Sequence, residues 1–259
     1  MKAMELYLST FYVFILILVR TLSFISTAPI LGHSVVPFQL KFWVSIFLSY
    51  IFLLTIDVNL NLSFEFLGFF ILILKEVIVG LIMGFSCWGI FYAVQFAGHL
   101  IGFDIGFSTS TAFDPEHSEP VPTLSQFKHY LSLSIFLMLN GHHFLLRSLS
   151  ASFEIVPISS FGVTGGLVGW GVKFISFVFI TAIKISAPIL VALFLTDIAI
   201  GILSRVFPQM NIFMFAFSVK IAVGFIALII AMPLFIAIFK KVLNVFEGDL
   251  IELLKLIRA

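Results

Sequence analysis

A few charged side chains inside long apolar runs are the residues of this sequence that could perform chemistry. They are Arg20, Lys75, Glu76, Lys173, Lys184, Asp197 and Lys220. Each charge costs about 2.5–3.5 kcal/mol at the centre of a bilayer, so these side chains must be paired, face water or contact other protein. A proton relay needs several carboxyls along a path, and only Glu76 and Asp197 lie within the apolar runs. Contacts that hold helices or subunits together are the alternative, and both interpretations remain open at this point.

Spacing places several of these charges on helix faces that also carry small residues. One such stripe contains Glu76, Gly80, Gly84 and Cys87. A second face contains Asp197, Gly201 and Arg205. The Gly80–Gly84 spacing is a GxxxG pattern, which lets two helix backbones approach closely. We therefore expect a set of buried polar residues at helix or subunit contacts, namely Arg20, Glu76, Asp197, Arg205 and Lys220.

The sequence contains no arrangement of residues that is typical of an enzyme. His142 and His143 are adjacent, so on a helix they point about 100° apart and cannot bind one metal from one face. No GxSxG motif, P-loop or nucleotide-binding fingerprint is present. Cys87 is the only cysteine, which excludes an intrachain disulfide and a thiolate metal cluster. We expect a protein without catalytic activity, metal or cofactor.

The chain that holds these residues has the composition of an integral membrane protein. Of the 259 residues, 61% are hydrophobic and only 10% are charged, and the mean hydropathy is +1.21. Soluble domains are about 45–50% apolar and about 25% charged. The net charge of +1 gives no indication of nucleic-acid binding. The composition therefore predicts an integral membrane protein whose apolar segments cross as helices.

The apolar residues form a series of regions separated by polar breaks. The regions are roughly 6–31, 42–56, 66–103, 130–149, 167–200 and 211–239. A membrane-crossing helix needs about 20 residues, so 66–103 and 167–200 are too long for one helix and predict a bend or a hairpin. Pro188 predicts a break in the latter. Residues 240–259 predict an amphipathic helix that lies at an interface or docks on a partner.

The longest polar break covers residues 104–129 and includes "IGFDIGFSTSTAFDPEHSEPVP" at its start. Glycines at every fourth position lead into it and predict a closely packed helix face; they are Gly98, Gly102 and Gly106. Ser and Thr side chains favour local bonds to the backbone over helix, and Asp114-Pro115 predicts a turn. A functional projection and a plain solvent loop are both compatible with this pattern.

Stretches quoted in order along the chain resemble the FliR family of the type III export gate. They include "TAPILGHSVVPFQLKFWVSIFLS", "KEVIVGLIMGF", "AGHLIGFDIGFSTSTAFDPEHSEPVPTLSQF", "LNGHHFLLRSLSASFEIVPI" and "LTDIAIGILSRVFPQMNIFMFAFSVKIAVG". The resemblance implies an all-α integral membrane protein with long kinked helices and helical hairpins. It would be a single subunit over 1–259 that looks like a P-type and a Q-type gate subunit fused. The resemblance also implies one copy of this chain with several copies of FliP and FliQ, FlhB on the outside and FlhA beneath, in the bacterial inner membrane at the flagellar basal body.

The resemblance further implies a gate through which unfolded flagellar subunits pass, with a loop of the R-type subunit that plugs the closed pore. The matching positions run from Gly106 to Pro122, and the expected plug residues are Gly106, Phe107, Ser108, Thr109, Ser110, Thr111, Ala112, Phe113, Asp114 and Pro115. The same role in a virulence injectisome is the first alternative. A secondary transporter for a small solute, using Lys173, Lys184 and Asp197, is the second.

Overall fold

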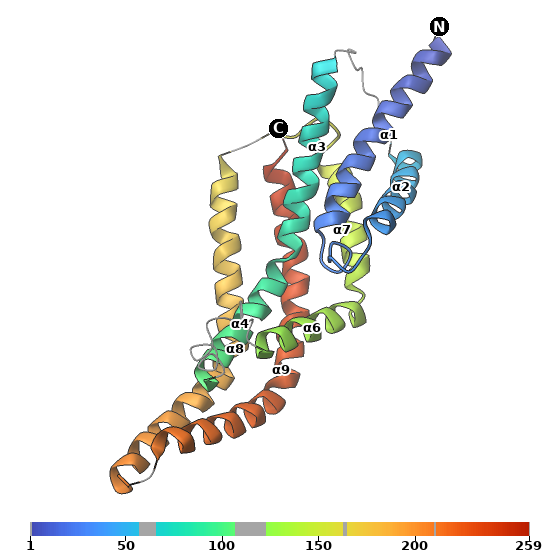
Figure 1. The fold of residues 1–259 in the computed structure, drawn as a ribbon. Coiled ribbons are helices and arrows are strands. Elements are labelled where there is room, and N and C mark those ends of the chain that lie inside the picture. The colour runs from blue at the N-terminus through green and yellow to red at the C-terminus, as the bar shows by residue number, and fades with distance from the viewer. Residues whose placement is uncertain (1, 57–65, 107–122, 163–164, 210, 259) are drawn as a thin grey trace. The chain divides into compact units, whose positions relative to one another are not determined.

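In a computed structural model, the elements described for this chain are helices, as the composition predicted (Figure 1). The structure describes residues 2–56, 66–106, 123–162, 165–209 and 211–258. The helices are α1 (Lys2–Thr27), α2 (Phe38–Thr55), α3 (Phe66–Cys87), α4 (Gly89–Ile105), α6 (Thr123–Met138), α7 (Gly141–Ile155), α8 (Gly166–Val206) and α9 (Ile212–Leu256). The all-α membrane fold is confirmed.

Within the described residues, five helical stretches are long and apolar enough to cross a membrane. These stretches are Ser9–Thr27, Phe38–Thr55, Leu67–Ile105, Gly166–Val206 and Met214–Leu256. Two further helices, α6 with 16 residues and α7 with 15, are not among them. The chain therefore combines membrane-length helices with two short helices that follow the polar break.

Two apolar regions that the sequence shows as continuous are interrupted in the structure. Region 130–149 is divided between α6 and α7 at Asn140, whose φ of 58° lies in the left-handed region that Asn tolerates better than most residues. Region 66–103 is divided at Trp88, whose indole N–H donates to the Thr27 carbonyl oxygen at 2.7 Å. The helices extend into the polar break that the sequence predicted over 104–129, because α4 continues to Ile105 and α6 begins at Thr123. The segment between the two helices is therefore shorter than predicted.

The predicted break at Pro188 is wrong, because α8 continues through it from Gly166 to Val206. Proline is tolerated inside membrane helices, where neighbouring helices and hydroxyl side chains satisfy the freed backbone groups. α9 likewise contains Pro233 and extends to Leu256, so the C-terminal segment continues a long helix instead of forming a separate one. The described chain separates into two compact units.

Unit 1 comprises Met1–Gly89, Asn140–Lys173 and Val245–Ala259. Its helices α1 and α3 run parallel, because successive residues of one meet successive residues of the other. The Tyr12 and Phe69 rings lie 4.8 Å apart near the start of both helices. A Cβ atom on Gly80 would lie 2.6 Å from the Arg20 carbonyl oxygen, and one on Gly84 would lie 2.8 Å from the Thr27 Cβ. The GxxxG pattern therefore permits the close approach that its spacing predicted.

The C-terminal part of α9 docks on other segments of unit 1 through its apolar face. Phe246, Leu250 and Leu253 are buried, and the Phe246 ring lies 6.3 Å from that of Phe144 in α7. The Gly162 N–H donates to the Ile257 carbonyl oxygen at 3.0 Å, which fixes the end of the segment. The apolar face of this segment therefore packs on its own chain, and the two roles that the sequence left open, at an interface or on a partner, stay predictions.

Unit 2 comprises Ile90–Leu139 and Phe174–Asn244, and its core joins α4, α6, α8 and α9. Residues from each of these helices form a buried or partly buried apolar cluster, including Ile101, Ile105, Leu124, Ile189, Leu193 and Ile221. Gly98 lets α4 approach α6, because a Cβ there would lie 2.6 Å from the Ser125 Cα. The Ser125 hydroxyl donates to the Gln95 carbonyl oxygen at 3.0 Å and ties the same two helices together.

We predict that Gly80→Ala lowers the stability of the chain, whereas Gly169→Ala does not. In an open helix position, Ala is favoured over Gly by about 1 kcal/mol. A Cβ at Gly169 meets nothing within 4 Å, but one at Gly80 meets the α1 backbone, and such overpacking typically costs about 1–3 kcal/mol. Thermal unfolding in detergent measures both effects. Equal midpoints for the two variants would contradict the close α1–α3 contact.

Candidate functional site

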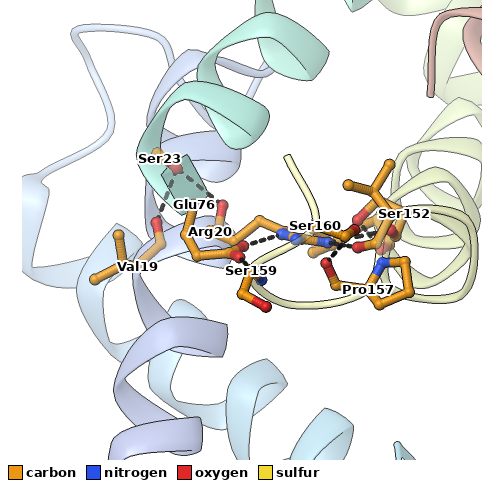
Figure 2. Close-up of polar contacts among 10 residues, drawn as sticks. Val19, Arg20, Ser23, Glu76, Ser152, Pro157, Ser159 and Ser160 are labelled. Atoms are coloured by element: carbon orange, nitrogen blue, oxygen red, sulfur yellow. Dashed lines mark hydrogen bonds and ion pairs between the residues drawn. The ribbon is translucent and has the colours of Figure 1, made fainter. Parts of the chain in front are cut away.

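A buried ion pair between α1 and α3 is the centre of the polar network in unit 1 (Figure 2). Arg20 Nε donates to Glu76 Oε2 at 2.5 Å, and neither side chain is exposed. Taking two charges out of water costs several kcal/mol each, which is offset only when their remaining hydrogen-bonding groups also find partners. The surroundings of both side chains therefore decide whether this pair is tolerated.

Arg20 finds further partners at the C-terminal end of α7. Its Nη1 donates to the carbonyl oxygens of Ser152 at 3.1 Å and Val156 at 2.8 Å. The Ser152 carbonyl also accepts the Val156 N–H at 2.9 Å, and the C-terminal end of a helix carries the negative end of its dipole, so a cation is favoured there. The guanidinium also lies 4.6 Å from the centre of the Phe153 ring, a cation–π contact. Arg20 thus caps α7 while it pairs with α3.

Glu76 binds the turn that follows α7. Its Oε1 accepts a hydrogen bond from the Ser159 N–H at 3.0 Å, and the neighbouring Lys75 ammonium donates to the Ser159 carbonyl oxygen at 3.3 Å. Ser159 has a φ of 77°, which is unusual for a residue other than glycine and persists only when surrounding contacts hold it. Arg20 and Glu76 therefore join α1, α3, the end of α7 and the following turn (Figure 2).

A second pair of opposite charges lies in unit 2, between α8 and α9. Lys220 Nζ lies 2.7 Å from Asp197 Oδ1, with side chains 20% and 41% exposed. Lys220 also donates to the carbonyl oxygen of Asp104 at 3.3 Å, close to the end of α4. The chain then reaches Gly106, whose φ of 98° is a conformation that L-residues rarely adopt. Lys220 therefore anchors the end of α4 just before the predicted plug.

The other predicted site residues are placed as follows. Arg205 is exposed and is not joined to Asp197, although the sequence puts them on one face. Gly98 packs on α6, and Gly102 is buried. Lys173 pairs with Glu252 at 2.7 Å on the surface, and Lys184 is exposed. The expected plug residues beyond Gly106, from Phe107 to Pro115, lie outside the described residues, so the plug stays a prediction.

Lys128 is a buried charge that the sequence interpretation missed. It lies within the segment assigned to the polar break, but the structure places it on α6 with only 4% exposure, beside a groove of about 460 Å³. Burial lowers the pKa of the Lys128 ammonium from 10.5 to about 8. Leu124, Lys128 and Leu131 line the groove and are spaced as residues on one face of a helix. This spacing of a cation between two leucines is the sequence pattern that could have indicated the buried lysine.

The described residues contain no group of three or more His, Cys, Asp or Glu side chains that could hold a metal ion. The arrangement in unit 1 instead fixes helices against one another. Arg20 binds two backbone carbonyls and the Glu76 carboxylate, and Glu76 also accepts from a backbone N–H. All of these groups belong to the same chain.

We predict that Glu76→Gln destabilises the chain strongly and that Arg20→Met together with Glu76→Gln recovers part of the loss. Removing one partner leaves the other charge buried without compensation, which costs about 3–5 kcal/mol. Thermal unfolding in detergent of the unmodified protein, of both single variants and of the double variant supplies the cycle. Lys173→Gln is the matched control, because it breaks an exposed pair and should leave the midpoint unchanged. Strictly additive losses for Arg20 and Glu76 would contradict the coupling.

Comparison with known proteins gives concordant results. Residues 11–245 match the family "Bacterial export proteins, family 1". The flagellar biosynthetic protein FliR of Bacillus subtilis is 35% identical over 240 residues, which cover 92% of this chain and 91% of the relative. The FliR of Escherichia coli is 29% identical over 240 residues, covering 91% and 92%. The surface presentation of antigens protein SpaR of Shigella sonnei is 30% identical over 154 residues, or 58% of each chain.

The family match covers nearly the whole chain, and the structure supplies the membrane-length helices that such a protein requires. The chain belongs to the bacterial export proteins of family 1, the FliR membrane proteins of flagellar biosynthesis and type III protein export.

Proposed function

We propose that this chain is a core pore subunit of the flagellar export gate, where one copy assembles with FliP and FliQ. FlhB and FlhA are its further partners, and unfolded flagellar subunits pass through the assembly across the bacterial inner membrane at the basal body. The observation that carries the proposal is the family match over residues 11–245, which leaves only short ends unmatched. The proposed role is structural and requires no cofactor.

The exposed surface of the single chain supports assembly with other polypeptides. In the most apolar 18-residue stretch of α2, and likewise of α9, only 17% of the residues are buried. Lipid or protein must therefore cover long apolar faces of these helices. Lipid alone does not suit all of these faces. Lys184 lies exposed in the middle of α8, and a charge that faces acyl tails costs about 2.5–3.5 kcal/mol. Contact with neighbouring subunits removes this cost.

The flagellar branch is favoured over a virulence injectisome by the extent of the matches. The two FliR relatives align with more than nine-tenths of this chain, whereas SpaR aligns with 58% of it. Neighbouring genes test this choice directly. Genes for flagellar proteins beside this one support the proposal, and genes for needle-complex proteins contradict it.

We predict that the tagged chain co-purifies from membranes with several copies each of two smaller membrane proteins, FliP and FliQ. Mass measurement of the intact complex in detergent gives the composition, because each subunit has a distinct mass. Glu76→Gln should reduce the yield of the complex, since it disrupts unit 1, while Lys173→Gln should not. A chain that purifies alone as a stable monomer would overturn the proposed assembly.

We also propose that the segment from Gly106 to Pro115 plugs the closed pore, with Phe107 and Phe113 filling a narrow lumen. Support comes from the turn at Gly106 and from the anchoring of α4 by Lys220 immediately before it. Deleting residues 107–113 should leave complex yield intact but raise the membrane's ion conductance. A deletion of equal length in another polar break, residues 58–64, is the control and should not leak. No rise in conductance after the first deletion would count against the plug.

A further inference from the structure

The groove in unit 2 has a buried floor and an open, apolar mouth. Its volume is about 460 Å³, and its walls come from α6, α8 and α9. Leu124, Ile189 and Phe235 are buried at 5% exposure or less, whereas Ile229 is 71% exposed and Phe225 is 48% exposed. This size lies within the range of about 300–1,000 Å³ that is typical of ligand sites.

One cation lies in this apolar lining. The Lys128 ammonium is 5.5 Å from the centre of the Phe235 ring, and the other groove residues are all apolar. The described part of the chain therefore gives this ammonium an aromatic face but no carboxylate in the groove. Burial lowers its pKa to about 8, so Lys128 still carries its charge at neutral pH. A buried cation without a counter-charge is costly, and an anion that entered the groove would relieve this cost.

We propose that this groove binds one anionic phospholipid, with an acyl chain against the apolar floor and the phosphate group beside Lys128. Three features of the groove favour a lipid. Its walls include α8 and α9, which are long and apolar enough to cross a membrane, where acyl chains would reach them. Its mouth is apolar and exposed. Its cation lies on the short helix α6, which is not among the membrane-length helices.

A protein segment is the rival occupant, but it fits the charge less well. To neutralise Lys128, a partner helix would have to insert a carboxylate, and that carboxylate would lose its own hydration on burial. A phospholipid brings its anion and its apolar chain in one molecule, so a single occupant supplies both the counter-charge and the apolar contact. The lipid therefore satisfies the cation and the apolar lining of the groove together.

The test compares phosphatidylglycerol with phosphatidylcholine on the full chain, purified in detergent with the subunits that accompany it. Native mass spectrometry counts the lipids retained. We expect the unmodified protein to retain phosphatidylglycerol about fivefold more tightly, as one lysine near a headgroup typically gives. Lys128→Met should abolish this preference, and Lys128→Arg should keep it. Lys184→Met is the matched control, because it removes an exposed cation of α8 that does not line the groove.

Two further measurements distinguish the contribution of the Lys128 charge to lipid binding from the contribution of the groove itself. Ala231→Phe keeps Lys128 but fills the groove, so retention of both lipids should fall. Raising the pH well above 8 should weaken the preference in the unmodified protein and not in Lys128→Arg, because Lys128 is the only titratable side chain in the described lining. Lys128→Met should also unfold at a higher temperature than the unmodified protein in phosphatidylcholine, which shows that the variant folds.

Several outcomes would overturn the proposal. Equal retention of the two lipids by the unmodified protein would remove the role of charge, and an unchanged preference in Lys128→Met would remove the role of Lys128. A photo-reactive residue in place of Phe127, at the mouth of the groove, reports the occupant in intact cells. Cross-links to lipid support the proposal, whereas cross-links only to another protein show that a partner segment fills the groove.

Discussion

The polar architecture of unit 1 depends on one buried interaction, the ion pair of Arg20 and Glu76. Neither side chain reaches solvent, so their partners come from protein, and among the described residues Nη2 of Arg20 has no hydrogen-bond partner. Arg20 meets a carboxylate, two terminal carbonyls and an aromatic face, and Glu76 meets the guanidinium and a backbone N–H. Buried pairs contribute little net stability over apolar replacements, but losing one member is costly. The pair therefore acts as a constraint on which arrangement of helices is permitted.

The charged side chains of the apolar segments fall into two classes, which differ in whether they need a partner from outside the chain. Those paired within the chain, such as Asp197 with Lys220, need no outside partner. Those left exposed, such as Lys184 and Arg205, do need one, and so does Lys128, which is buried without a counter-charge among the described residues. An isolated chain thus carries incomplete electrostatics at specific positions. The incomplete positions are where contact with lipid headgroups, water or other subunits has the most to contribute.

The sequence predicted local features well because they depend on composition and helical period. The membrane class, the helical fold and the Gly80–Gly84 contact surface all follow from residues close in sequence. The partner of Glu76 could not be predicted, because Arg20 lies 56 residues away and several other cations were available. The capping of α7 by Arg20 could not be predicted either, because its acceptors are backbone carbonyls, which every residue carries. Lys128 was missed because the polar break was drawn by composition across the start of a short helix.

Close packing and charge together fix the register of α1 against α3. Arg20, Ser23 and Thr27 face Glu76, Gly80 and Gly84 in the same order along parallel helices. The hydroxyls of Ser23 and Thr27 fold back to carbonyls of their own helix, which keeps that face of α1 compact. Small residues alone would tolerate a slip of one turn, about 5.4 Å. Such a slip would separate Arg20 from Glu76 and leave two buried charges unpaired, at a cost of several kcal/mol. Glycine thus permits the contact, and the ion pair selects one register.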